Sequence, residues 1–292
     1  MNKVIAIGEI VWDCLPAGKQ LGGAPLNFAF FAKELGADAY AVSAIGTDAL
    51  GEDTLDVASS TGVCLSYVQR NDLPTSRVLV SLNSDGIPQY EIVEGVAWDS
   101  IEAVDDALKL VADASVICWG SLAQRSEKSR ASILALIDKA PDTCVKVFDI
   151  NIRQHYYSRE VIEASLKRAS ILKLNEDELP LVAQMLGIEG CDNEIVSSLI
   201  DKYSLKYLIY THGADFSEVY SNDGEYSYMP TPKVSVADTV GAGDSFTAVF
   251  VTSLLSGKTV SESHALAVEV SAFVCTQNGA INPLPDYIRS KF

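Results

Sequence analysis

The residues from Asp238 to Phe250, "DTVGAGDSFTAVF", place two glycines and one carboxylate just before a run of small and apolar residues. Gly241 and Gly243 allow positive φ and let the backbone approach a ligand without interference from a Cβ atom. The apolar segment that follows ends at Gly257, so we expect a buried helix whose N-terminal end carries partial positive charge toward the same spot. The converging N–H groups and the helix end together predict an anion hole.

Asp244 is the unusual residue of this stretch, because an ordinary phosphate-binding loop would avoid a carboxylate that repels the anion. A carboxylate at this place can take the proton of an acceptor hydroxyl while the neighbouring N–H groups stabilise charge on a phosphoryl group in transfer. The structural alternative is that Asp244 only caps the helix, as carboxylates at helix N-termini often do. The stretch therefore predicts phosphoryl transfer to a hydroxyl group.

Composition limits the classes of partner. The chain of 292 residues has 22 Lys and Arg against 39 Asp and Glu, a formal net charge of −17, which disfavours nucleic acid and anionic membrane surfaces. A small anionic ligand is still compatible, since a local cluster of N–H groups can hold phosphate. The six cysteines show no metal-binding or redox spacing, and no apolar segment reaches the length of a membrane span. We expect reduced thiols, no membrane partner and a cytoplasmic protein.

Short apolar runs alternate with longer amphipathic segments along the chain, a pattern typical of a parallel sheet covered by helices. No low-complexity linker divides the chain, so we expect a single domain over residues 1–292. The expected strands are 3–10, 39–46, 115–120, 144–150, 170–175 and 206–213, and the expected helices are 24–36, 126–139, 159–169 and 176–186.

The rhythm changes between Gly62 and Asp99, where three strand candidates follow one another without a helix among them. The candidates are 63–70, 76–83 and 89–98. Such an excursion can form a small sheet that covers a cleft, or an ordinary edge sheet without ligand contact. The pattern alone leaves both interpretations open.

The residues also carry a family resemblance. The segment 238–250 resembles the C-terminal signature of the ribokinase-like (PfkB) carbohydrate kinases, and 21–53 resembles their N-terminal signature. The matching positions of the second segment are Gly22, Gly23, Asn27, Gly46, Asp48 and Gly51. The resemblance covers nearly the whole chain, and the stretches "GEIVWDCLPAGKQLGGAPLNFA" and "EGVAWD" look most like bacterial fructokinases.

The resemblance implies a three-layer α/β/α sandwich with a mostly parallel central sheet, and a small β-sheet lid formed by roughly residues 12–20 and 63–98. It implies transfer of the γ-phosphoryl group of ATP to a sugar hydroxyl with Mg²⁺. In this setting Asp244 matches the general base, and the backbone of Gly241, Ala242 and Gly243 matches the anion hole.

On the sugar side, the resemblance assigns hydroxyl-binding positions to Asp13, Gly22, Gly23 and Asn27. Asp and Asn offer complementary acceptors and donors, and glycine leaves room for the ring. Turn formation and helix capping are the alternative roles of Asp13 and Asn27. Arg153, in the "FDINIR" run at a strand's carboxyl end, is a candidate for contact with the sugar or the moving phosphoryl group.

On the nucleotide side, Asn175 and Glu178 of "LNEDELP" match a motif that organises hydrated Mg²⁺ and phosphates. Thr211 and Gly213 match the T-x-G of the nucleotide site, whereas the further glycine usually found three residues later is Phe216 here. This departure leaves the details of nucleotide contact open.

The C-terminal "QNGAINPLP" resembles the loop that closes over adenine, which makes Asn278 and Gly279 candidate nucleotide-binding residues. The resemblance also makes Asp238, with this loop, a candidate ligand of a monovalent cation such as K⁺. Pairing through the lids occurs among relatives, so a homodimer is a further expectation.

The acceptor is expected to be a neutral sugar, because Lys3 and Lys19 are the only basic side chains between Met1 and Asn27 and a bound phosphate normally recruits several cations. Fructose follows from the branch resemblance. The rivals are 2-keto-3-deoxygluconate, whose carboxylate Arg153 could pair with, and ribose or a nucleoside. A non-catalytic sugar sensor is a further alternative. It is disfavoured because the chain keeps Asp244, the candidate base, together with Gly241 and Gly243.

Overall fold

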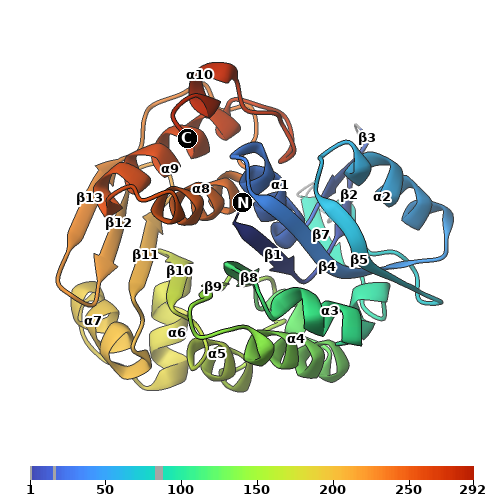
Figure 1. The fold of residues 1–292 in the computed structure, drawn as a ribbon, viewed down its shortest axis with the longest axis horizontal. Helices are drawn as coiled ribbons and strands as arrows, with labels where there is room; N and C mark the ends of the chain where they lie inside the picture. Colours follow the sequence, from blue (N-terminus) through green and yellow to red (C-terminus); the bar gives the residue numbers. More distant parts are fainter. Residues whose placement is uncertain (1, 16–17, 83–87) are drawn as a thin grey trace.

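The computed structural model describes residues 2–15, 18–82 and 88–292. Among these residues, a nine-stranded sheet has the order β13-β12-β11-β10-β9-β8-β1-β4-β5 (Figure 1). Its strands are β1 (Lys3–Ile7), β4 (Asp38–Gly46), β5 (Cys64–Asn71), β8 (Val116–Trp119), β9 (Val145–Asp149), β10 (Ile171–Asn175), β11 (Tyr207–His212), β12 (Phe216–Ser221) and β13 (Tyr226–Pro230). The strands from β5 to β11 pair in parallel, so their carboxyl ends meet at one edge. The hairpin of β12 and β13 adds two antiparallel strands.

Helices cover both faces of this sheet, as Figure 1 shows. One core cluster packs the sheet against α3 (Asp105–Val111), α4 (Glu127–Lys139), α5 (Arg159–Leu166), α6 (Glu178–Leu186) and α7 (Asp192–Tyr203). The other packs it against α1 (Ala24–Glu34), α2 (Ala49–Ser59), α8 (Ala242–Leu255), α9 (Val260–Cys275) and α10 (Asp286–Arg289). The predicted three-layer sandwich with a mostly parallel sheet is therefore confirmed.

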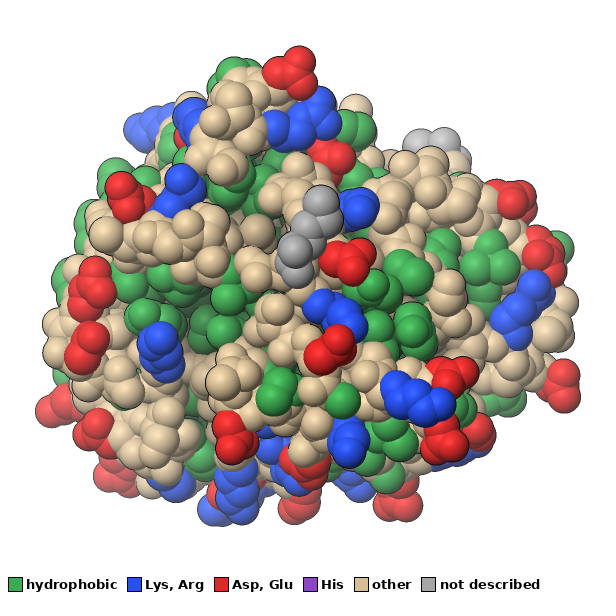
Figure 2. Space-filling view, viewed as in Figure 1, with side chains coloured by type: hydrophobic (Ala, Val, Ile, Leu, Met, Phe, Trp, Pro, Cys, Tyr) green, Lys and Arg blue, Asp and Glu red, His purple; other side chains and the backbone are tan. Residues whose placement is uncertain are grey.

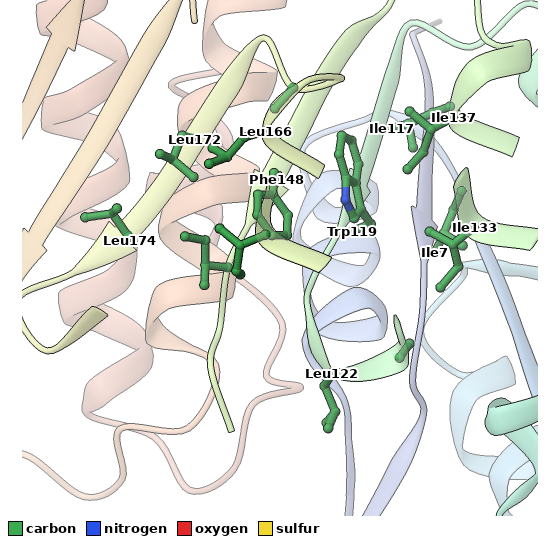
Figure 3. Close-up of a cluster of buried hydrophobic side chains, with 14 of the residues drawn as sticks. Ile7, Ile117, Trp119, Leu122, Ile133, Ile137, Phe148, Leu166, Leu172 and Leu174 are labelled. Atoms are coloured by element: carbon green, nitrogen blue, oxygen red, sulfur yellow. The ribbon is translucent and has the colours of Figure 1, made fainter. Parts of the chain in front are cut away.

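The first core cluster is built from strand residues that point to one face and from the apolar stripes of the helices above them (Figure 3). Trp119 of β8 stacks on Phe148 of β9, with ring centroids 5.7 Å apart. Both side chains are almost fully buried, and Ile133 and Ile137 of α4 lie in the same cluster. Burial of apolar area at about 25 cal/mol per Å² makes this layer a main source of stability.

A separate small sheet has the order β3-β2-β6-β7. Its strands are β2 (Val11–Leu15), β3 (Gly18–Gly22), β6 (Arg77–Leu82) and β7 (Pro88–Ile92). The predicted lid range of 63–98 was too wide, because β5 pairs with β4 at the edge of the large sheet. Residues 16–17 and 83–87, which the predicted lid ranges include, lie outside the described residues.

Hydrogen bonds to α2 and to its N-cap residue join the small sheet to the rest of the domain. The Trp12 indole N–H donates to Thr54 Oγ1 of α2 at 2.8 Å. The Asp48 carboxylate accepts from the amide of Gly51 at 2.8 Å, which caps α2, and from the amide and hydroxyl of Thr75 at 2.9 and 2.6 Å. The G-x-D-x-x-G part of the N-terminal signature thus holds the chain that enters β6.

A buried arginine fixes the chain that leaves the small sheet. Arg125 makes two 2.8 Å hydrogen bonds to the carboxylate of Asp99, and their side chains are only 7% and 12% exposed. Its guanidinium also donates to Val93 O at 2.7 Å and lies 4.0 and 4.7 Å from the ring centroids of Trp98 and Tyr156. The segment after β7 is therefore attached to both the start of α4 and the loop after β9.

The predicted helices at 126–139, 159–169 and 176–186 correspond to α4, α5 and α6.

Figure 2 shows acidic side chains spread around one face of the molecule, with basic side chains among them. Within the described residues, no helix combines the length and the apolar character needed to cross a membrane.

Candidate active site

The first turn of α8 lies at the edge where the parallel strands end, and it begins at Gly241. This residue has φ +81°, a left-handed conformation that favours glycine. A Cβ atom here would lie 2.6 Å from Ala280 Cβ and 2.9 Å from Ala280 Cα. Gly241 therefore serves both the turn and the close approach of the C-terminal loop.

Gly243 has a different reason to be glycine. The expectation of positive φ was wrong at this position, because Gly243 is inside the α-helix that starts at Ala242. A Cβ atom on Gly243 would lie 3.0 Å from the ammonium of Lys173, a side chain of β10. The missing side chain makes room for a buried cation directly beside the turn.

The amides of this turn are partly free to receive an anion. The Ala242 N–H donates to Thr239 O at 3.3 Å, a long turn bond. Within the described residues, the amides of Gly241 and Gly243 have no protein acceptor. Two of the three amides predicted for the anion hole are thus open, at a helix end that also attracts negative charge.

Asp244 is held from outside its own helix. Among the described residues, its carboxylate makes no hydrogen bond to the backbone amides of the first turn, so such capping does not account for this acid. Its Oδ2 instead accepts from Asn27 Nδ2 of α1 at 2.8 Å. Asn27 is 2% exposed, and its buried Oδ1 has no hydrogen-bond partner among the described residues. The amide side chain therefore orients the carboxylate and keeps one unused acceptor.

The surroundings of Asp244 favour a carboxyl group that exchanges protons near neutral pH. Burial, with a smaller contribution from the negative charge of Asp149, raises the pKa of Asp244 from 3.8 to about 6. The hydrogen bond from Asn27 and the positive charges of Lys173 and Arg153 act in the opposite direction. A pKa near the working pH is what general-base catalysis requires.

The predicted sugar-binding residues come together on the small-sheet side of Asp244. Asp13 lies on β2, and a Cβ atom on Gly22 would be 3.6 Å from Asp13 Oδ2. Gly23 has φ +112°, and a Cβ there would lie 2.5 Å from Glu9 O. Burial and the charge of Asp238 raise the pKa of Asp13. Gly22 thus lies beside the Asp13 carboxylate, and Gly23 allows the close approach of the chain that follows β1.

Arg153 belongs to the same group by its charge, although its side chain is exposed and donates to Ile152 O at 3.0 Å. Its positive charge lowers the pKa values of Glu9, Asp13 and Asp244. The structure thus brings Arg153 close to the acids of the site, with its guanidinium available to a ligand.

Glu9 was not anticipated by the sequence analysis. It follows β1 and is 3% exposed, and its buried Oε2 atom has no hydrogen-bond partner in the part of the chain that the structure describes. Burial is the largest of the effects that raise its pKa to about 7. Its only signal in the sequence was an acid placed in the otherwise apolar run "KVIAIGEI".

Asn175 and Glu178 are used by the backbone around them. Asn175 Oδ1 accepts from the amides of Asp177 and Glu178, both at 3.0 Å. The Glu178 carboxylate accepts from the Asn175 amide at 2.9 Å and from the Ile152 amide at 2.8 Å, and burial raises its pKa. The pair therefore closes the turn into α6 and joins it to the loop after β9.

This arrangement bears on where Mg²⁺ could be held. Within the described residues, no group of three or more His, Cys, Asp or Glu side chains could hold a metal ion. The two oxygens of Glu178 already face backbone amides, so a direct protein cage does not fit. A hydrated Mg²⁺ bound mainly by ligand phosphates does fit, since this ion keeps several of its waters.

Thr211 and Gly213 lie at the carboxyl end of β11, next to the turn that follows β10. Thr211 O accepts from the Glu176 amide at 3.1 Å, and a Cβ atom on Gly213, whose φ is +46°, would lie 3.1 Å from Glu176 Oε1. Phe216 begins β12 and stacks on His212, with centroids 3.9 Å apart. The side chain in place of the usual glycine is therefore packed against its own hairpin.

The C-terminal loop reaches back to α8 through Asp238. Its carboxylate accepts from the amide of Val240 at 3.1 Å and from the amide of Gly279 at 3.0 Å. A Cβ atom on Gly279 would lie 3.0 Å from Gln20 Oε1 of β3, so this loop also borders the small sheet. Asn278 O accepts from Asn282 Nδ2 at 3.1 Å. The side chain of Asp238 holds two loops together.

A buried polar network beneath the turn was also missed. Lys173 Nζ donates to Asp149 Oδ1 at 3.1 Å, and Thr247 Oγ1 of α8 lies 2.9 Å from Asp149 Oδ2. Lys173 and Asp149 are 7% and 5% exposed. A lone lysine in the apolar run "SILKLN" was the available signal, since a buried ammonium needs a partner.

The site therefore combines a partly buried carboxylate with a pKa of about 6, open amides at a helix end, and the nearby carboxyl groups of Glu9 and Asp13. Figure 1 shows α1 and α8 side by side above the sheet, which places Asn27 and the first turn of α8 together. This arrangement suits proton removal from a hydroxyl next to an anionic group.

Comparison with known proteins gives a consistent result. The model of the pfkB family of carbohydrate kinases matches residues 7–287. The ATP-dependent 6-phosphofructokinase of Thermoanaerobacterium thermosaccharolyticum is 29% identical over 300 residues, which cover 97% of this chain and 91% of that protein. A fructokinase of Escherichia coli is 29% identical over 309 residues, which cover 97% of this chain and 96% of that protein.

The fold has close counterparts among solved structures. The structure of a fructokinase with bound ATP from Xylella fastidiosa superimposes with a TM-score of 0.84 at 21% sequence identity. The match covers 97% of this chain and 95% of that chain.

Proposed function

The chain belongs to the pfkB family of carbohydrate kinases, and on that premise we propose that it transfers the γ-phosphoryl group of ATP to a neutral sugar, with fructose as the acceptor. The observation that carries this proposal is the position of the Asp244 carboxylate, oriented by Asn27 at 2.8 Å and adjacent to the open amides of the α8 turn. Proton acceptor and anion hole thus lie at one point.

In the proposed reaction, Asp244 takes the proton of the attacking sugar hydroxyl as its oxygen forms a bond to the γ-phosphorus. The bond from phosphorus to the bridging oxygen breaks, and its electron pair leaves with ADP. The amides of Gly241 and Gly243 stabilise the negative charge on the phosphoryl oxygens, and the end of α8 adds to their effect. Mg²⁺, when bound with ATP, supplies charge neutralisation between the phosphates.

The remaining residues are proposed to bind the two substrates. Asp13, Asn27 and the space beside Gly22 and Gly23 would receive the sugar hydroxyls, and Arg153 would contact the sugar or the phosphoryl group. On the nucleotide side the proposed contacts are Thr211, Gly213, Asn278 and Gly279, with Asn175 and Glu178 acting on Mg²⁺ through water and Asp238 as the candidate K⁺ ligand.

The charges near the proposed sugar site favour a neutral sugar over a phosphorylated one. Lys3 pairs with Asp113 at 2.5 Å, and Lys19 pairs with Asp53, so both lysines of the N-terminal segment are already engaged. Glu9, Asp13 and Asp244 instead contribute carboxyl groups to the proposed sugar site. An incoming phosphate would meet these acids with Arg153 as its main counter-charge.

Phosphorylation of fructose 6-phosphate is the second candidate, because the 6-phosphofructokinase named above is as similar in sequence as the fructokinase. A screen of ATP consumption with fructose, fructose 6-phosphate, 2-keto-3-deoxygluconate, ribose and adenosine separates these functions. We expect a clear preference for fructose. A higher kcat/KM for any other acceptor refutes the assignment, and sugar binding by calorimetry without turnover indicates a sensor.

The small sheet is proposed to act as a lid over the sugar site. The whole chain is proposed to form a single kinase domain. Its strand β2 carries Asp13, and β3 brings Gln20 next to the C-terminal loop at Gly279. Pairing of two chains through this sheet remains part of the proposal, and light scattering that finds only monomers at assay concentrations contradicts it.

A further inference from the structure

The first turn of α8 rests on a buried ion pair from the neighbouring strands. Asp149 ends β9 and Lys173 lies in β10, and their side chains meet at 3.1 Å. The Lys173 ammonium also lies next to Gly243, where an added Cβ would be only 3.0 Å away. The cation thus lies beside Gly243, a residue whose amide the proposed function assigns to the anion hole.

The same ion pair is attached to α8 by a hydroxyl. Thr247, one turn after Gly243, has its Oγ1 2.9 Å from Asp149 Oδ2 and 3.0 Å from Gly243 O. The Asp149 carboxylate is therefore shared between Lys173 and the helix. Sheet and helix are joined at the point where the phosphoryl group is expected to move.

Taken together, these contacts have a function beyond stability. We propose that Lys173 is a positioning residue, whose ammonium, held by Asp149 and fitted against Gly243, fixes the first turn of α8 and sets the charge that Asp244 experiences. This inference rests on the proposed function of the same site. It assigns Lys173 no contact with substrate.

The charges that face Asp244 allow a test by sign. Asp149 raises the pKa of Asp244, whereas Lys173 and Arg153 lower it, and the hydrogen bond from Asn27 lowers it as well. Glu9 on the chain after β1 is a further acid that interacts with Asp244. Loss of Lys173 and loss of Asp149 should therefore move the titration of Asp244 in opposite directions.

The first experiment uses no substrate, so it does not depend on which sugar is the acceptor. Titration of the Asp244 carboxyl carbon by NMR is compared in the wild type, Lys173→Met and Asp149→Asn. We expect a higher pKa in Lys173→Met and a lower pKa in Asp149→Asn. The double variant should return toward the wild type, because one negative and one positive neighbour are removed together. Unchanged titration in both single variants overturns the inference.

The second experiment measures kcat and KM with whichever acceptor the substrate screen identifies. Lys173→Met should lower kcat by about 10-fold or more while the KM for the sugar changes little, since misplaced catalytic groups slow the chemical step. The acid limb of the pH profile should shift to higher pH in Lys173→Met and to lower pH in Asp149→Asn. A merely structural pair would reduce stability without these opposite shifts.

Folding controls keep the outcome clear. Removing one partner of a buried ion pair is strongly destabilising, so Lys173→Met could fail to fold, whereas the double variant has no unpaired charge. A folded double variant with wild-type kcat contradicts the positioning role. Lys109→Met is the matched control, because its ion pair with Asp106 is exposed and its loss should leave the titration of Asp244 in place. A wild type that phosphorylates no sugar refutes the proposed function but leaves the NMR test intact.

Discussion

Asn27 and Asp244 are separated by 217 positions in the sequence, yet the amide of one donates to the carboxylate of the other at 2.8 Å. The bond joins α1 to the first turn of α8, and it connects the proposed sugar-binding segment with the segment proposed to stabilise the phosphoryl group. The amide group thus fixes which way the proposed base points.

Replacement of this base separates binding from chemistry. Asp244→Asn should lower kcat by about 100-fold or more and leave sugar binding largely intact, since the amide cannot accept the proton. Steady-state kinetics gives the first value and calorimetry with fructose gives the second. Asp56→Asn, at an exposed position of α2, is a matched control that should keep full turnover. Wild-type turnover in Asp244→Asn excludes the base role.

The pH profile should report the same group. Because Asp244 acts as a base only when ionised and its pKa is raised to about 6, kcat/KM for the sugar should fall as pH drops below about 6. Glu9, whose pKa is raised to about 7, is the other acid that titrates in this range. The acid limb should persist in Glu9→Gln, and its loss in that variant would assign the limb to Glu9.

A raised carboxyl pKa also predicts a sign for stability. Folding raises the pKa of Asp244 above its ordinary 3.8, so the ionised form is disfavoured in the folded state. This destabilisation is absent below pH 3.8 and complete above about pH 6. Asp244→Asn should therefore have the higher free energy of unfolding in urea at pH 8, with the difference shrinking toward pH 4. Equal stabilities at pH 8 contradict the burial of this charge.

The two left-handed glycines at 241 and 257 separate backbone strain from packing. Gly257 has φ +88° with no atom near an added Cβ, so Gly257→Ala should reduce the free energy of unfolding by about 1–2 kcal/mol. Gly241→Ala should lose more, because Ala280 must also move, and its kcat should fall. Urea unfolding and kinetics check both. Equal losses in the two variants would show that the contact with Ala280 is unimportant.

The ion pair of Arg125 and Asp99, called the buried clamp below, should contribute more to the free energy of unfolding than an exposed ion pair does. Arg125→Leu leaves the Asp99 carboxylate buried without its partner, and we expect a loss of about 3–5 kcal/mol by urea unfolding. Lys109→Ala removes the ion pair with Asp106, whose side chains are 76% and 80% exposed, and should have little effect. Similar small effects of both changes would contradict the buried clamp.

Much of this architecture could be predicted because it follows from local pattern. Apolar runs alternating with amphipathic segments gave the parallel strands and α4, α5 and α6. The strand at 64–71 was assigned to the wrong sheet, since a strand's own residues do not specify its partner. The hairpin of β12 and β13 was not anticipated either, although the residues of β12 alternate between partly buried and buried positions.

The site was less predictable, because contacts between distant segments decide it. The glycines and the acid at 244 were recognisable as a motif, but the reason for Gly243 became visible only with Lys173 beside it. Lys173 was hidden in an apolar strand and Glu9 in the apolar run that follows β1, where polar residues are few. A charged residue near the carboxyl end of a buried strand is the signal that would have revealed both.

The packing of α1 against α8 has a consequence for folding during synthesis. Phe28 and Phe31 of α1 are buried against a layer to which α8 and α9 contribute, so these rings leave the ribosome long before their cover does. Until then the nascent chain exposes an apolar surface that chaperones recognise and that promotes aggregation. Truncated chains that stop before α8 should accordingly be recovered as insoluble or chaperone-bound material.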